Sequence, residues 1–183
     1  MQLHLRSKEL AWGGLMMAFC IVLIVLSGVI ETSSAFLLAA ASFITGLIGR
    51  KFNLRISVLF AVGTFILGFF LVPQKLYCFT FAGFSVYVIV AEYFREHDYG
   101  KVISLIVKGV CYHVLLVAAL VMLKYFVGFD IVSGSKWLSS IKDIPALLVL
   151  IAIIAAELMW LIFDRAYLFF QDRYGGRLTN VGY

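Results

Sequence analysis

The feature that most constrains this chain is its division into six long apolar segments joined by short polar connections. A water-soluble domain covers its core with polar residues, yet 63% of these 183 residues are hydrophobic and the mean hydropathy is +1.04. Such a chain is expected to lie in a lipid bilayer. There, every backbone N–H and C=O must be paired within the protein, so only helices or a closed barrel can span it.

The pattern within each segment favours helices over barrel strands. A barrel strand alternates apolar and polar residues over about 10 positions, whereas each segment here is continuously apolar and close to the ~20 residues of a spanning helix. We therefore predict an all-α membrane protein, a single bundle of six transmembrane helices that forms one domain over residues 1–183. The predicted helices cover residues 10–30, 34–49, 56–72, 76–95, 102–126 and 144–170.

The charged connections predict the topology. Six spans put both termini on one side, together with the arginines Arg50, Arg55 and Arg95, whereas lysines such as Lys75 lie on the other side. Because positively charged loops stay inside, both termini are expected in the cytoplasm, in a multi-pass protein of the cell membrane. A five-span arrangement would distribute the arginines over both faces.

The two prolines mark helix ends in this scheme. Pro73 follows the third apolar segment, and Pro145 lies in the first turn of the sixth, where a missing N–H does no harm. Both positions fall on the predicted outer side. The longest connection, residues 127–143, also lies there, and a loop of this length is often functional.

Common phosphate-binding and catalytic motifs are absent from the sequence. It contains no phosphate-binding G-x-x-x-x-G-K-[ST], no H-E-x-x-H and no G-x-S-x-G. The three cysteines, Cys20, Cys78 and Cys111, all lie in apolar segments and are expected to be free thiols. We predict no enzyme activity, no catalytic residue, no metal and no cofactor. The net charge of +5 is spread over the loops, so it points to topology and not to nucleic acid.

Two ionisable residues are expected deep in the membrane. Glu157 lies about 12 residues into the last segment, where a carboxylate costs roughly 2.5–3.5 kcal/mol unless it is paired, wet or protonated. His113 reaches a similar depth, so a contact between the two is feasible. Tyr112 is expected to point elsewhere, because consecutive helical residues lie ~100° apart. Trp160 shares a face with Glu157. The pair is interpreted either as part of a solute cavity or proton path, or as core groups satisfied by a neighbouring helix.

Glu92 lies nearer the predicted inner end of its segment. Lys108 is at a similar depth on the next segment and is expected to pair with it. We interpret this pair as structural.

Small residues gather on one face of the first segment. Gly14 and Ala18 are four positions apart, and Ala11 lies near the same face. Small residues at this spacing let another helix approach closely, which is the main route to helix packing in lipid. The face is expected either to pack within the bundle or to dock a partner.

Taken together, the layout and the segment Gly14-Leu15-Met16-Met17-Ala18 resemble the substrate-binding S component of an energy-coupling-factor (ECF) transporter. The family motif is usually Ala-x-x-x-Ala, so Gly14 departs from it but keeps the close approach. The stretch from Phe69 to Lys75 is also similar to one in a group of firmicute six-helix membrane proteins, which have Pro-x-Lys there. The resemblance implies a vitamin-like or micronutrient-like solute bound from outside, a transmembrane coupling subunit, and two separate ATPase subunits.

The resemblance also implies a pocket shaped by the later helices and the outer loops, and a first helix that docks on the coupling subunit. The expected substrate-binding residues are Lys75, Tyr77, His113, Glu157 and Trp160, with Trp137 in a lid. The expected docking residues are Ala11, Gly14 and Ala18.

Two other functions fit the same sequence. One is a structural membrane partner resembling the MreD-type scaffold, which needs no outer pocket. The other is a proton-coupled carrier that uses Glu157 and His113 and works without an ATPase. A scaffold retains only protein partners on purification, whereas a carrier transports alone in liposomes.

Overall fold

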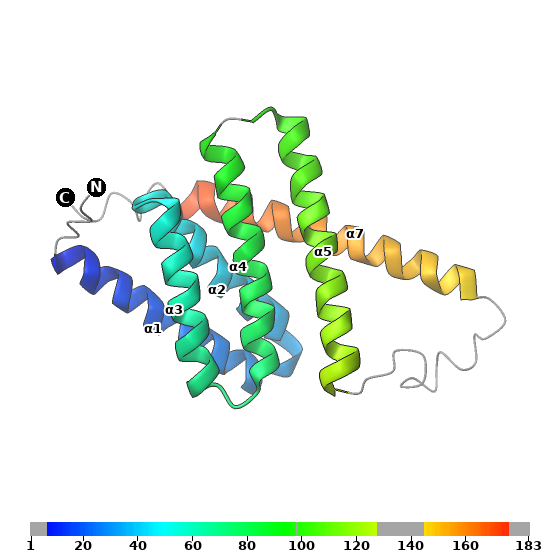
Figure 1. The fold of residues 1–183 in the computed structure, drawn as a ribbon, viewed down its shortest axis with the longest axis horizontal. Coiled ribbons are helices and arrows are strands. Elements are labelled where there is room, and N and C mark those ends of the chain that lie inside the picture. The colour runs from blue at the N-terminus through cyan, green and yellow to red at the C-terminus, as the bar shows by residue number, and fades with distance from the viewer. Residues whose placement is uncertain (1–6, 98, 128–144, 176–183) are drawn as a thin grey trace. The chain divides into compact units, whose positions relative to one another are not determined.

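The computed structural model describes residues 7–97, 99–127 and 145–175. These residues form α-helices and contain no strand, so the all-helical prediction is confirmed for the described part (Figure 1). A 3-10 turn, Glu31–Ser33, precedes the second helix, and a π-helical turn, Gln171–Gly175, follows the last. The helices are α1 (Ser7–Val29), α2 (Ser34–Lys51), α3 (Leu54–Leu71), α4 (Lys75–Glu96), α5 (Lys101–Val127) and α7 (Pro145–Phe170).

The helix ends lie within three residues of the predicted ones, and local chemistry explains several of them. The side-chain oxygen of Asn53 accepts a hydrogen bond of 2.9 Å from the backbone N–H of Ile56, which caps the first turn of α3. Pro73 follows the end of α3, and Pro145 is the first residue of α7, as predicted. The last turn of α2 carries Arg50 and Lys51, whose charges favour a helix C-terminus.

Five of the described helices, α1 to α5, are long and apolar enough to cross a membrane. The structure therefore supports a membrane-spanning helical protein. The sixth predicted span corresponds to α7, which is 26 residues long. The full count of six spans and the side on which the termini lie stay predictions.

The chain divides into two compact units, and each is described by itself. The first unit joins residues 1–108 with residues 167–183, and the second runs from residue 109 to residue 166. Both α5 and α7 therefore contribute residues to each unit. The prediction of one domain over residues 1–183 stays a prediction.

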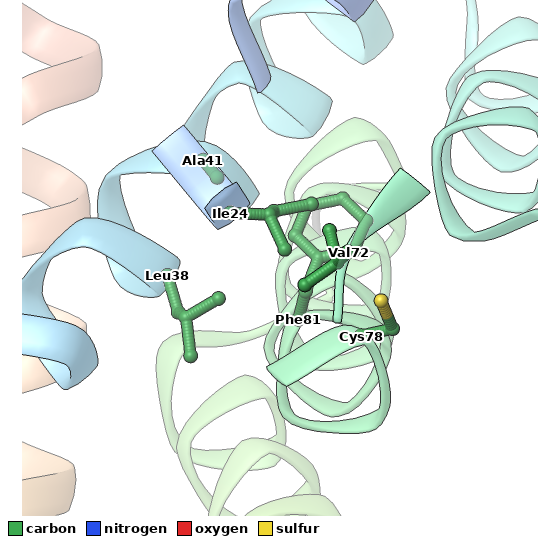
Figure 2. Packing of buried hydrophobic residues seen from close by; sticks show 6 residues of the cluster. All are labelled: Ile24, Leu38, Ala41, Val72, Cys78 and Phe81. Carbon is green, nitrogen blue, oxygen red and sulfur yellow. The ribbon is translucent and has the colours of Figure 1, made fainter. Parts of the chain in front are cut away.

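Helix α2 lies at the centre of the first unit. It packs against α1, α3 and α4, and every residue from 41 to 48 is buried. This half of α2 is therefore covered on all sides, as in an interior helix, although the sequence marks α2 only as the shortest apolar segment. Side chains from α1, α2 and α4, with Val72 at the end of α3, meet beside it (Figure 2), and the cluster consists of Ile24, Leu38, Ala41, Val72, Cys78 and Phe81.

Candidate functional site

The predicted contact between His113 and Glu157 is present in the second unit. Nε2 of His113, on α5, lies 3.0 Å from Oε1 of Glu157, on α7. Nδ1 of the same imidazole lies 2.8 Å from the backbone carbonyl oxygen of Gly109, one turn earlier. The two side chains are 47% and 43% exposed, so the pair is open to its surroundings and not enclosed by the described residues.

The hydrogen bonds of His113 fix how many protons the pair holds. A carbonyl oxygen only accepts, so Nδ1 must carry a proton and donate it to Gly109. The contact between Nε2 and Oε1 then requires one further proton, which resides on either the imidazole or the carboxyl group. In both arrangements the pair carries no net charge, which lowers the penalty of placing it among apolar helices.

Two aromatic side chains flank the pair. The hydroxyl of Tyr112 donates a hydrogen bond of 3.1 Å to the backbone carbonyl of Ala156. Its ring stacks on Trp160, with centroids 6.4 Å apart and an interplanar angle of 30°, and meets His113 edge-on at 5.6 Å. Gly109 lies under the indole, which would be only 3.5 Å from an added Cβ. This arrangement combines a planar apolar surface with a hydrogen-bonding pair.

The expectation that Tyr112 points away from this region is wrong. A step of ~100° separates Tyr112 from His113 on α5, but both side chains are long enough to reach α7. The sequence signal was present, since a tyrosine within an apolar span needs a partner for its hydroxyl.

Lys75 and Tyr77 belong to the first unit, where both have local contacts. Nζ of Lys75 donates to the carbonyl oxygens of Phe69 and, at 2.9 Å, of Val72, so the ammonium caps the end of α3. Tyr77 packs against the core cluster, and its ring would lie 3.4 Å from an added Cβ on Gly28. Neither unit by itself assembles the full set of predicted substrate-binding residues. Trp137 lies outside the described residues.

The small-residue face of α1 is open in the described structure. Ala11, Gly14 and Ala18 are all exposed, and a Cβ added to Gly14 would meet nothing within 4 Å. The described residues therefore do not use this face for packing within the bundle.

Glu92 lies at the centre of a polar cluster in the first unit. Arg50 donates to Oε1 through Nε at 2.9 Å and approaches it through Nη2 at 2.8 Å, while Nε of Arg95 lies 2.6 Å from Oε2. The hydroxyl of Tyr167 also donates to Oε1. The Glu92 side chain is only 3% exposed. Arg95 lies three residues further along the same helix, whereas Arg50 and Tyr167 meet Glu92 only when α2, α4 and α7 pack, so the sequence did not predict them. The pairing of Glu92 with Lys108 stays a prediction.

A groove of about 260 Å³ lies between α3 and α4 in the first unit. Its lining is almost entirely apolar, so it suits hydrocarbon better than a polar solute, and it contains none of the predicted substrate-binding residues. The lining residues are Val58, Ala61, Val62, Phe65, Phe79, Ala82, Ser85, Val86 and Ile89.

No group of three or more histidine, cysteine or acidic side chains among the described residues is placed to hold a metal ion. Comparison of the chain with protein-family models, with curated proteins and with solved structures gives no match.

Proposed function

We propose that this protein is the membrane-embedded solute-binding subunit of an ECF-type transporter, with six spans and both termini in the cytoplasm of a bacterial cell. The observation that carries the proposal is the pair of His113 and Glu157, which lies half-exposed among apolar helices and is flanked by Tyr112 and Trp160. Ionisable groups within membrane spans mark substrate or ion pathways by default.

The chemistry of the pair suits a small solute with a polar edge and a planar apolar face. His113 and Glu157 supply a hydrogen-bond donor and an acceptor, while the indole of Trp160 supplies a flat surface. Ligand sites usually combine aromatic walls with a few polar groups that set orientation. A vitamin-like or micronutrient-like compound is the class that fits these groups.

The open face of α1 supports a protein partner. A helix that presents Ala11, Gly14 and Ala18 outward can be approached closely by another membrane helix. In the proposed assembly this face docks on a transmembrane coupling subunit, and two ATPase subunits supply the energy that this chain has no motif to supply.

Co-purification tests the proposed assembly. The tagged protein, extracted in mild detergent from its own membranes, should bring down the coupling subunit and both ATPases. Gly14→Leu should abolish this, because the added side chain blocks close approach while meeting no atom of the chain near its Cβ. Gly83→Leu is the matched control, since a Cβ on Gly83 also meets nothing within 4 Å. Recovery of other membrane proteins with no ATPase would favour a scaffold.

A proton-coupled carrier is the second candidate, favoured by the single proton that His113 and Glu157 must share. A carrier of this kind moves solute in liposomes without other subunits. Glu157→Gln should stop that transport, because the amide cannot exchange the proton. Transport that needs the ATPase subunits would exclude this candidate.

A further inference from the structure

The last turn of α7 is attached to α2 by contacts that only a glycine permits. The hydroxyl of Tyr167 and Nε2 of Gln171 occupy the space where a Cβ on Gly46 would lie, the latter at 2.7 Å. Gln171 also donates a hydrogen bond of 3.1 Å to the backbone carbonyl of Phe43. Tyr167 and Gln171 are each only 1% exposed. The end of α7 is therefore seated directly on the backbone of the central helix.

Glu92 links these contacts of Tyr167 to the charged ends of α2 and α4. Its carboxylate holds Tyr167 on one side and Arg50 and Arg95 on the others. A buried carboxylate is tolerated only while these partners stay in place. Arg95, however, is 50% exposed and Arg50 is 18% exposed, so the two arginines are accessible from outside the cluster and the carboxylate is not. The cluster around Glu92 is thus strong when all its partners are in place. Its exposed arginines are the edge at which other groups can compete for these contacts.

Two features of the attached segment weaken its closed state. The turn Gln171–Gly175 is π-helical. This geometry is rare in proteins overall, but where it occurs it is often at a functional site. Within the described residues, Oε1 of Gln171 is buried without a hydrogen-bond partner, and a buried polar atom without a partner opposes closure. The segment therefore has a reason to open that residues 41–48 of α2, against which it packs, do not share.

We propose that Glu92, Tyr167 and Gly46 form a latch, which holds the end of α7 against α2 and opens locally while the helices stay folded. The same helix carries Glu157 and Trp160, 10 and 7 residues before Tyr167. Because α7 is one continuous helix, opening of the latch releases the end of the helix that carries both residues and so regulates the solute site, a role that rests on the proposed function. Glu92, Tyr167 and Gly46 act through α7 and do not touch the solute.

Hydrogen exchange on the full chain in lipid nanodiscs tests the latch. Backbone amides of residues 168–175 should exchange at least tenfold faster than those of residues 41–48 in α2. Glu92→Gln should raise exchange over 168–175 at least a further tenfold and leave 41–48 unchanged. Glu96→Gln, an exposed glutamate on the same helix end, is the control and should change neither.

Fluorescence of Trp160 supplies a readout that a merely structural role would not move. With Trp12 and Trp137 replaced by phenylalanine, Trp160 is the sole tryptophan. Glu92→Gln should shift its emission to longer wavelength as the stack on Tyr112 loosens, and Glu96→Gln should not.

Neither readout needs a solute, so failure of the latch and failure of the proposed function are separate results. If Glu92→Gln does not fold, Tyr167→Phe takes its place, since it removes one hydroxyl, and it should raise exchange over 168–175 about threefold. Exchange over 168–175 that matches 41–48 in every folded variant would overturn the proposal. So would an unmoved Trp160 emission.

Discussion

Two glutamates in apolar helices show how differently the same side chain is accommodated in this protein. Glu92 is 3% exposed, and its carboxylate is held by two arginines and a tyrosine. Glu157 is 43% exposed and contacts a histidine that itself must share a proton with it. Arginine never gives up its proton in a protein, whereas histidine readily does. The first arrangement fixes a helix in place, and the second leaves a polar pair that a solute or a proton can change.

The comparison predicts that removing the Glu92 charge has the largest effect on stability. Glu92→Gln removes the buried charge that pairs with Arg50, which is 18% exposed, and with Tyr167, so the free energy of unfolding should fall by about 3 kcal/mol. Denaturant unfolding in micelles measures this. Glu96→Gln should stay within ~0.5 kcal/mol of the wild type. An equal effect of the two substitutions would remove the distinction between a buried and an exposed carboxylate.

A smaller loss of stability is expected when a side chain is added to Gly46, against which the end of α7 packs. Gly46→Ala places a methyl group where Tyr167 and Gln171 lie, and such overpacking should lower the free energy of unfolding by about 2 kcal/mol. Gly83→Ala on α4 is the control, because its methyl meets nothing within 4 Å, and it should be neutral or slightly stabilising. The same unfolding assay compares the two. A neutral Gly46→Ala would mean that α7 does not rest on α2 as described.

In the second unit the expected losses of stability are smaller still. Tyr112→Phe removes the hydrogen bond to the carbonyl of Ala156 and keeps the ring on Trp160, so it should lower stability by about 1 kcal/mol. Solute retention should fall only modestly, because the stacked surface remains. A complete loss of retention would assign the hydroxyl of Tyr112 a direct role in binding.

Glu157→Gln is expected to have the smallest effect on stability, less than about 1 kcal/mol, because its ion pair is half-exposed. The same substitution should lower solute retention at least tenfold. Glu157→Gln is thus expected to affect binding strongly and stability weakly, whereas Glu92→Gln is expected to affect stability most. This difference is measured by unfolding and by ligand retention on one protein preparation, and a loss of stability as large as that of Glu92→Gln would contradict it.

The helices could be predicted from the sequence because lipid leaves a simple signal. Continuous apolar runs fix where a span lies, and Pro73 and Pro145 mark where helices end or begin. The contact between His113 and Glu157 followed from their equal depth on helices joined by one connection. These inferences need only position along a helix.

Two partners of Glu92 could not be predicted in the same way, although Arg95, three residues further along α4, is within reach from spacing alone. Arg50 and Tyr167 lie 42 and 75 residues away in sequence, and they meet only through the rotation and crossing of three helices. The same is true of Gly46, whose role depends on what packs over it and not on its own helix. Lys75 was assigned to a pocket through the family resemblance, but its described hydrogen bonds go to the end of α3. Its place in a substrate site stays a prediction.

Native mass spectrometry of the purified protein tests the central claim most directly. If the pair on α5 and α7 binds the solute, the wild type and Glu96→Gln should carry a small-molecule adduct, and Glu157→Gln and His113→Ala should lack it. An adduct that is equally abundant on all four proteins, or absent from the wild type, would contradict the account.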